Sequence, residues 1–417
     1  MIYNISDKPP FNKAILFAIQ MVLSVFVATV LIANICGVAT SGALVGASLS
    51  TIVYLIVTKM KSPMFLSNSG AFVAPVIFAL SVGGYLGIAV GGLTSCIVYC
   101  IFGIIFSRIP YEKIYNIFPP ALIGAVTVVI GVNLMPFILT YVQINGETSI
   151  YGVIVALLTT LAIALVSHYS KGLFRILPFL IGILFGYLIS CILTITNIYP
   201  IIDFSLFKNI GLIKMPNFAF SNWESFNFNL IPIIVMFIAY TISAIMECLS
   251  DHAALSGIIE TDLYKEPGLS KIFIGEGIAN LVGSTIGGLG ICSYGEGVAC
   301  VGFSKVASTY VTLFAALILG LLGFIEPIQA FIASIPSCVF AGAAIILYGF
   351  IACSGIKMLQ KTNLNEQKNL IIVSSVLSLG ISGLVVGGNT ISFSATALAL
   401  IVGIILNLFL KEKNNAE

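Results

Sequence analysis

The sequence predicts an all-α polytopic membrane protein with fourteen transmembrane segments. Of its 417 residues, 59% are hydrophobic and only 8% are charged, and the mean hydropathy is +1.13. A soluble chain of this length needs far more charge to cover its surface. The apolar residues form long blocks, such as 14–36 and 396–410. A block of about 20 residues crosses the roughly 30 Å core of a bilayer. The net charge of +2 is too small to indicate a nucleic-acid partner.

The fourteen segments follow one another with short connections, except for the long connection 198–229 between the seventh and the eighth. The third and tenth segments are the least regular, because Gly and Ser interrupt both of them and Pro75 interrupts the third. The expected ranges are 14–36, 41–58, 63–81, 84–107, 118–140, 150–167, 173–197, 230–250, 269–287, 290–304, 306–325, 328–353, 369–387 and 391–410.

The basic residues orient these segments. With the N-terminus in the cytoplasm, sixteen of the 18 lysines and arginines fall in connections or tails on the inner side, as the positive-inside rule requires. Only Lys208 and Lys214 fall outside, both in the connection 198–229. With one span fewer or one span more, many of these basic residues would fall on the outer side. It therefore indicates a multi-pass protein of the cytoplasmic membrane with both termini cytoplasmic.

Seven spans in each half make the second half enter the membrane from the opposite side, which defines a 7+7 inverted repeat of residues 1–205 and 206–417. Two weak internal similarities support it. The stretches "PPALIGAVTVVIG" (119–131) and "PSCVFAGAAIILYG" (336–349) share a Pro, a Gly-Ala pair and a second Gly seven residues after the first. Two interrupted stretches, "SNSGAFVAP" (67–75) and "ICSYGEGVA" (291–299), lie at a similar offset.

Interrupted segments at corresponding positions of two halves point to a binding site near the middle of the membrane. Non-helical backbone survives in a bilayer only where it is buried in protein or lines a wet cavity. Two such breaks would aim free amide groups and the positive ends of two half-helices at one shared cavity. The sequence therefore predicts a site for a small polar ligand between the third and tenth segments.

Acidic residues inside the membrane identify candidate side chains for this site. Glu247, Glu276 and Glu296 lie at membrane depth, and Asp251 lies at the inner end of the eighth segment on the same helix face as Glu247. A carboxylate at the bilayer centre costs roughly 2.5 kcal/mol or more, so it is normally functional or protonated. For Glu276 a purely interfacial role near Lys271 is an equal alternative.

The sequence contains no pattern for a metal, a cofactor or an intramembrane enzyme. The nine cysteines lie mostly within apolar blocks and form no CxxC pair. An intramembrane enzyme would need a nucleophile with a base, or paired metal ligands, at membrane depth. His168 and His252 are expected at the cytoplasmic ends of helices instead.

Several motifs together resemble the nucleobase–cation symporter family, also called the nucleobase–ascorbate transporters, which comprises uracil and xanthine permeases. The resemblance covers almost the whole chain. Its motifs are "DKPP" (7–10), Gln20 with "ATVL" (28–31), "SGAFVAP" (69–75), "YKEPGL" (264–269), "SYGEG" (293–297) and "LYGFIACSGIKML" (347–359).

The resemblance implies a core domain made of segments 1–4 and 8–11, a gate domain made of segments 5–7 and 12–14, and a short strand in each of segments 3 and 10. By position, Glu247 and Glu296 match the carboxylates that bind the nucleobase ring. Further matching contacts are Phe72, Tyr294 and Gly295, and the residues expected to close the pocket are Ala28 and Tyr348. The resemblance also allows a homodimer through the gate domain.

Departures from the family pattern leave the substrate open. Gly297 replaces the Asn of the family signature, and Ala299 replaces its Gly. Glu296 is similar to uracil-type members, whereas Asp251 and Glu276 are similar to purine-type members. Met21 stands where many members carry His.

We therefore expect a secondary active transporter, not an enzyme, that imports uracil, xanthine or a related purine by proton symport. The acidic cluster has no cationic partner at its depth, so Glu247, Asp251 and Glu276 are the expected proton carriers. An anion exchanger or channel of the same fold is the main alternative, although Glu247 and Glu296 would repel an anion.

Overall fold

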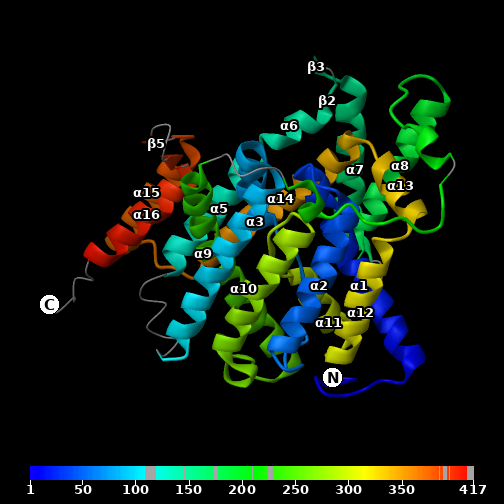
Figure 1. Ribbon diagram of the computed structural model, residues 1–417. Coiled ribbons are helices and arrows are strands. Elements are labelled where there is room, and N and C mark those ends of the chain that lie inside the picture. The colour runs from blue at the N-terminus through cyan, green and yellow to red at the C-terminus, as the bar shows by residue number, and fades with distance from the viewer. Residues whose placement is uncertain are drawn as a thin grey trace.

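The computed structural model describes residues 1–108, 119–144, 147–171, 177–208, 210–223, 229–384, 386–387, 392–393 and 395–410. The protein is a bundle of helices (Figure 1). Within these ranges, seven helices are long and apolar enough to cross a membrane. They are α1 (Phe11–Ile35), α2 (Thr40–Val57), α3 (Val73–Phe106, with the turn before it), α7 (Ile150–Tyr169), α8 (Pro178–Ile195), α9 (Leu230–Ile259) and α14 (Ser337–Leu359).

The remaining helices are shorter or more polar. Four of them are apolar, namely α5 (Pro120–Leu134), α12 (Thr309–Leu322), α15 (Gln367–Ile381) and α16 (Ala395–Phe409). The others are α6 (Phe137–Val142), α10 (Leu269–Ile286), α11 (Gly295–Ser304) and α13 (Glu326–Ser334). Short turns of helix form η1 (Gly70–Phe72), η3 (Phe204–Phe207), η4 (Ala219–Asn222) and η5 (Tyr264–Gly268).

Two strands meet in the middle of the bundle. β1 (Leu66–Asn68) and β4 (Ile291–Ser293) pair antiparallel, with Leu66 opposite Ser293 and Asn68 opposite Ile291. The short strands expected in the third and tenth segments are therefore present and bonded to each other. Two further antiparallel pairs join β2 (Gln143–Ile144) to β3 (Glu147–Thr148) and β5 (Val386–Gly387) to β6 (Ser392–Phe393). The β2–β3 pair lies at the end of the molecule opposite the N-terminus (Figure 1).

Side chains from neighbouring helices complete the hydrogen bonding of the central strand pair. The side-chain amide of Asn68 donates to the carbonyl of Thr29 on α1 at 3.0 Å. Asn280 on α10 donates to the carbonyl of Ile291 at 2.7 Å. Because a two-stranded sheet leaves edge groups unpaired, and such groups are costly where water is excluded, these polar side chains make the strands tolerable in the core.

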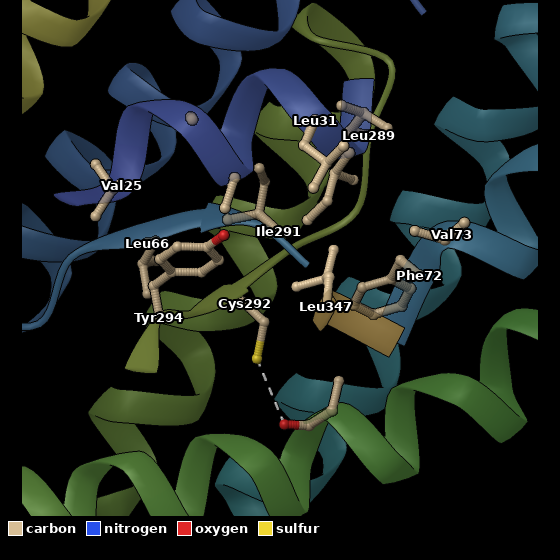
Figure 2. Packing of buried hydrophobic residues seen from close by; sticks show 14 of the residues in the cluster. Val25, Leu31, Leu66, Phe72, Val73, Leu289, Ile291, Cys292, Tyr294 and Leu347 are labelled. Atoms are coloured by element: carbon tan, nitrogen blue, oxygen red, sulfur yellow. Dashed lines mark hydrogen bonds between the residues drawn. The ribbon is translucent and has the colours of Figure 1, made fainter. Parts of the chain in front are cut away.

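The strand pair is embedded in the main hydrophobic core. Leu66, Ile291 and Cys292 are fully buried in one cluster with Leu31 and Phe72 (Figure 2). The thiol of Cys292 donates to a main-chain carbonyl of α9 at 3.5 Å. This packing holds the starts of α3 and α11 at fixed positions on either side of the strands.

Small residues let several helices approach closely. A Cβ atom at Gly46 of α2 would lie 2.8 Å from the backbone of Gly287 at the end of α10, and one at Gly124 of α5 would lie 2.9 Å from the carbonyl of Gly355 on α14. Such close backbone contacts are the usual way that membrane helices pack. The pairs α2–α10 and α5–α14 are antiparallel, since later residues of one helix contact earlier residues of the other.

The structure breaks the predicted twelfth segment in two. The range 328–353 was expected to be one span, but α13 ends at Ser334 and α14 begins at Ser337. Pro336 precedes the first turn of α14, and the residue before a proline disfavours helix. The expected boundary between the third and fourth segments, 63–81 and 84–107, is present as a kink within α3, because the backbone of Gly84 is non-helical, with φ 57° and ψ −154°.

Candidate functional site

A cavity of about 580 Å³ lies beside the central strand pair, within the range typical of small-molecule sites. Ile32 of α1 and Thr127 and Ile130 of α5 contribute to its wall, most of which comes from four other parts of the fold. These are the turn η1 with the preceding serine (Ser69, Gly70, Ala71), α9 (Ser243, Glu247, Ser250, Asp251), the start of α11 (Tyr294, Gly295, Glu296, Ala299) and α14 (Leu347, Phe350, Ile351). The two interrupted segments of the sequence thus meet at one cavity.

Three carboxyl groups face this cavity. Glu247 is exposed to it, and Asp251, one turn further along α9, is half-buried with its Oδ2 atom unpartnered among the described residues. Glu296 lies in the first turn of α11 and is also half-buried. Ser69 lies within hydrogen-bonding reach of Glu247. The cavity therefore offers acceptors for the N–H groups of a ligand.

Main-chain donors at the start of α11 lie in the same cavity wall as these acceptors. α11 begins at Gly295, and the first amides of a helix have no carbonyl partner inside that helix. The positive end of the helix dipole strengthens them as donors to a partial negative charge. The site therefore combines carboxylates and free amides, which suits a neutral ring that carries both N–H and carbonyl groups.

A second cavity of about 530 Å³ adjoins the first. Glu296, Ala299 and Phe350 line both of them. The predicted site residue Ala28 lines only this second cavity, together with Val27 of α1 and the beginning of α8. Ala28 therefore shares the second cavity with Glu296 but does not line the cavity that contains Glu247.

Two predicted site residues lie behind the cavity wall. Phe72 is 1% exposed and stacks on Phe237 of α9, with ring centroids 6.0 Å apart. Its amide donates to the carbonyl of Ser69 at 3.1 Å, within the turn η1. Tyr348 is fully buried, and its neighbour Leu347 faces the cavity instead. Neither aromatic side chain lines the cavity, and the hydroxyl of Tyr348 has no hydrogen-bond partner among the described residues.

Glu276 is also outside the cavity. It is fully buried on α10, where its Oε2 atom accepts the amide of Ser293 at 3.2 Å. His252, expected at a helix end near the interface, is instead fully buried, and that expectation is wrong. Its Nε2 atom lies 2.7 Å from the hydroxyl of Tyr54 on α2. A partner so distant in sequence gave no local signal of this burial.

The cavity includes polar residues that sequence reasoning did not select. Ser69, Thr127 and Ser243 contribute hydroxyl groups, and Lys357 in the last turn of α14 contributes a cation. The serine of "SNSGAFVAP" stands directly before the break, which is a signal that could have identified Ser69. Lys357 was counted only as a topology marker.

A model of the permease family, which covers xanthine and uracil permeases, matches residues 12–387. The chain belongs to this permease family. It is therefore a transporter and not an enzyme, and with its several apolar helices it is a multi-pass membrane protein. The resemblance found in the motifs is confirmed.

Curated relatives align with this permease over nearly its full length. A uracil permease of Bacillus caldolyticus is 30% identical, with 100% of this chain and 96% of the relative covered. A uracil permease of Escherichia coli (strain K12) is 30% identical over 98% of this chain and 93% of the relative.

Solved structures of other transporters share the fold. The transmembrane domain of the cyanobacterial bicarbonate transporter BicA aligns with a TM-score of 0.61 at 16% identity, covering 97% of this permease and 100% of that domain. Murine Slc26a9, an anion transporter solved in the inward-facing state, aligns with a TM-score of 0.68 at 10% identity, covering 97% of this permease and 68% of that chain. At such identities the likeness concerns the fold alone.

Proposed function

We propose that this permease imports a nucleobase, with uracil as the first candidate, across the cytoplasmic membrane by proton symport. The observation that carries the proposal is that Glu247 and Glu296 face one cavity beside the free amides at the start of α11. A nucleobase presents ring N–H groups and carbonyls at fixed angles, which this set of acceptors and donors complements. The relatives named uracil permease support the same substrate class.

The substrate contacts are assigned to the residues around this cavity. Glu247 and Glu296 would accept ring N–H groups, and the Gly295 amide would donate to a ring carbonyl. Tyr294 lines the same wall. Phe72, Tyr348 and Ala28 would act more indirectly, the first two through the lining residues next to them in the chain and Ala28 from the adjoining cavity. Xanthine is the second substrate to test, because Asp251 and Glu276 resemble purine-type members.

Proton coupling is assigned to the acidic groups of the core. Glu247 and Asp251 face the cavity, and Glu276 lies behind it. Protonation would let a carboxyl group move between two states without carrying a bare charge past apolar side chains, since an ion buried without a partner costs several kcal/mol.

We also propose the 7+7 inverted repeat with fourteen crossings and two cytoplasmic termini. Corresponding segments of the two halves pack on each other in antiparallel pairs, as β1 with β4, α2 with α10, and α5 with α14. A two-fold axis in the membrane plane would produce this pairing. The core and gate domains and the homodimer through the gate domain stay predictions.

With this topology we propose that the structure is in an inward-facing state. Lys357 and Met358, near the cytoplasmic end of α14, line the substrate cavity. On the opposite side, the hydroxyl of Tyr141 on α6 donates to the carbonyl of Ile35 at the end of α1. Contacts on one side and an accessible cavity on the other are the pattern of alternating access.

Transport by the purified protein in proteoliposomes tests the function. Radiolabelled uracil and xanthine would be offered with an inward proton gradient, with a sodium gradient, or with neither. We expect accumulation of at least one base that a protonophore abolishes. Accumulation that depends on the sodium gradient would refute proton coupling. Exchange of bicarbonate or chloride without uptake of a base would instead favour the alternative hypothesis of an anion exchanger or channel.

A further inference from the structure

A buried polar cluster lies behind β4, apart from the substrate cavity. The thiol sulfur of Cys248, a ring nitrogen of His252 and a carboxyl oxygen of Glu276 all lie within 4.8 Å of one another. All three residues are fully buried, and none of them lines the cavity. The Oε1 atom of Glu276 has no hydrogen-bond partner among the described residues. An unpaired buried carboxyl oxygen is unfavourable, so its retention calls for a functional explanation.

A chain of hydrogen bonds leads from this cluster toward the end of α2. The hydroxyl of Tyr54 lies 2.7 Å from Nε2 of His252 and 2.9 Å from Oγ of Ser62. Ser62 is buried, but Lys61 beside it in the chain is exposed. Lys61 pairs with Glu266, and its hydrogen bond and charge hold the pKa of that carboxyl below its usual value. The chain thus ends next to a charged, solvated loop.

The imidazole of His252 can carry a proton through this chain. Its Nδ1 atom lies 2.8 Å from the carbonyl of Cys248, which can only accept, so Nδ1 carries a hydrogen in the neutral ring. Nε2 then accepts from Tyr54. When the ring is doubly protonated, Nε2 donates to Tyr54, which can in turn donate to Ser62. Because Tyr54 has one hydroxyl hydrogen, it donates either to Nε2 or to Oγ of Ser62, and the geometry of the 2.9 Å contact has Tyr54 as the donor to Ser62.

We propose that His252 and Tyr54 form a proton route from Glu276 to the loop 58–62, separate from the path of the substrate. This inference rests on the proposed proton symport. The hydroxyl of Tyr54 turns its hydrogen from Nε2 to Ser62, and Glu276 then gives its proton to Nε2, while Nδ1 keeps its own hydrogen. A gap of at most 4.8 Å separates a carboxyl oxygen of Glu276 from a ring nitrogen, and one water or a turn of the carboxyl group closes it. His252 passes a proton from Nε2 to Tyr54, and Tyr54 passes its own to Ser62.

The proton balance of this route is closed. One proton leaves Glu276, which becomes a carboxylate, and one proton leaves Ser62. Because Ser62 is fully buried, this last transfer to the solvent around Lys61 needs a bridging water. A turn of the hydroxyl groups restores the starting arrangement, since Nδ1 keeps its hydrogen on the carbonyl of Cys248 throughout. In the proposed topology this solvent is cytoplasmic, so the route releases the proton on the side where the base is released.

Every element packed around the cluster contributes a titratable group. They are Tyr54 from α2, Tyr99 from α3, Cys248 and Asp251 from α9, Glu276 from α10 and Cys292 from β4. Tyr99 belongs to a different branch, since its hydroxyl lies 3.7 Å from the thiol of Cys292, which donates to the carbonyl of Ala244. A main-chain carbonyl cannot pass a proton on, and Tyr99→Phe is therefore a matched control for Tyr54→Phe.

Time-resolved infrared spectroscopy after a pH jump tests the route on the purified full-length protein. The carboxyl band of Glu276 would be assigned by its loss in Glu276→Gln. We expect Tyr54→Phe and His252→Gln to slow the response of this band by roughly tenfold or more, since a positioned acid or base typically speeds proton transfer by at least that factor. Tyr99→Phe should respond at the wild-type rate.

Exchange of the base across the proteoliposome membrane distinguishes a role of Tyr54 in proton transfer from a purely structural role. In Tyr54→Phe, exchange and base affinity should stay within about twofold of wild type, while proton-driven accumulation falls with the infrared rate. A band of Glu276 that responds equally fast in wild type and in both route variants, or that does not respond to pH at all, would overturn the route. Wild-type accumulation that ignores a pH gradient would instead defeat the proton symport, and the infrared rates would still decide the route.

Discussion

The hydroxyl of Tyr141 donates a hydrogen bond of 2.6 Å to the main-chain carbonyl of Ile35. This bond joins α6 to the end of α1, and in the proposed domain division it links gate to core on the outer side. The cavity lies on the other side of this contact. Opening the site outward must therefore break the bond.

Tyr141→Phe should shift the permease toward an outward-facing state. A neutral hydrogen bond contributes about 0.5–1.5 kcal/mol, which corresponds to a roughly two- to tenfold change in the equilibrium. The cavity residue Ile32, replaced by Cys, would report the change through its labelling by an impermeant thiol reagent from outside. Tyr187→Phe is the control, because the Tyr187 hydroxyl bonds Ser334 at 2.9 Å within the proposed gate domain. Equal labelling in the two variants would argue against this role of Tyr141.

The interrupted segments were predictable because their composition carries the signal. Gly, Ser and Pro in 67–75, and Gly and Ser in 291–299, disfavour a continuous helix. The structure places both breaks together as β1, β4 and the helix starts that follow them. The position of Glu247 and Glu296 at a polar cavity was also predictable, because a carboxylate within an apolar segment needs polar surroundings.

Which individual side chains point into the cavity was not predictable in the same way. A segment that is apolar all round gives no hydrophobic periodicity from which to derive its rotation. Tyr348 and Phe72 therefore could not be distinguished from their lining neighbours Leu347 and Ala71. The break at Pro336 was hidden for a related reason, because the apolar run continues across it.

Asn280→Ala should destabilise the central strand pair. The substitution leaves the buried carbonyl of Ile291 without its donor, which costs about 1–3 kcal/mol. Thermal unfolding in detergent should show this loss together with weaker base binding, because β4 leads directly into Tyr294 and Gly295. Ser284→Ala is the matched control on the same helix, since its hydroxyl bonds the carbonyls of its own helix. A variant Asn280→Ala as stable as Ser284→Ala would contradict the anchoring role.

Cysteine labelling in intact cells should establish on which side of the membrane the positions 208 and 361 lie. Lys208 and Lys361 are both exposed, and the proposed topology places them on opposite sides of the membrane. In a background without the native cysteines, an impermeant reagent should label Lys208→Cys in intact cells and Lys361→Cys only after permeabilisation. Labelling of both, or of Lys361→Cys alone, in intact cells would exclude fourteen crossings with cytoplasmic termini.

Glu247→Gln and Glu296→Gln should separate substrate recognition from proton coupling. Each substitution keeps the shape of the side chain but turns an acceptor-only carboxylate into a group that also donates. A hydrogen bond to a charged partner contributes about 1.5–3 kcal/mol, so affinity for the preferred base should fall roughly 10- to 150-fold. Equilibrium binding of uracil and xanthine to the purified variants measures this loss and any change in preference.

The two variants should differ in coupling. Glu296 lies at the start of α11, where the free amides can hold the base without it, so Glu296→Gln should shift the preference between bases and keep accumulation tied to the proton gradient. Glu247→Gln removes an assigned proton carrier that is exposed to the cavity, so it should lose concentrative uptake while it still exchanges bound base. Unchanged affinity and selectivity in both variants would place the binding site elsewhere. Proton-driven accumulation that survives in Glu247→Gln would leave Asp251 or Glu276 as the carrier.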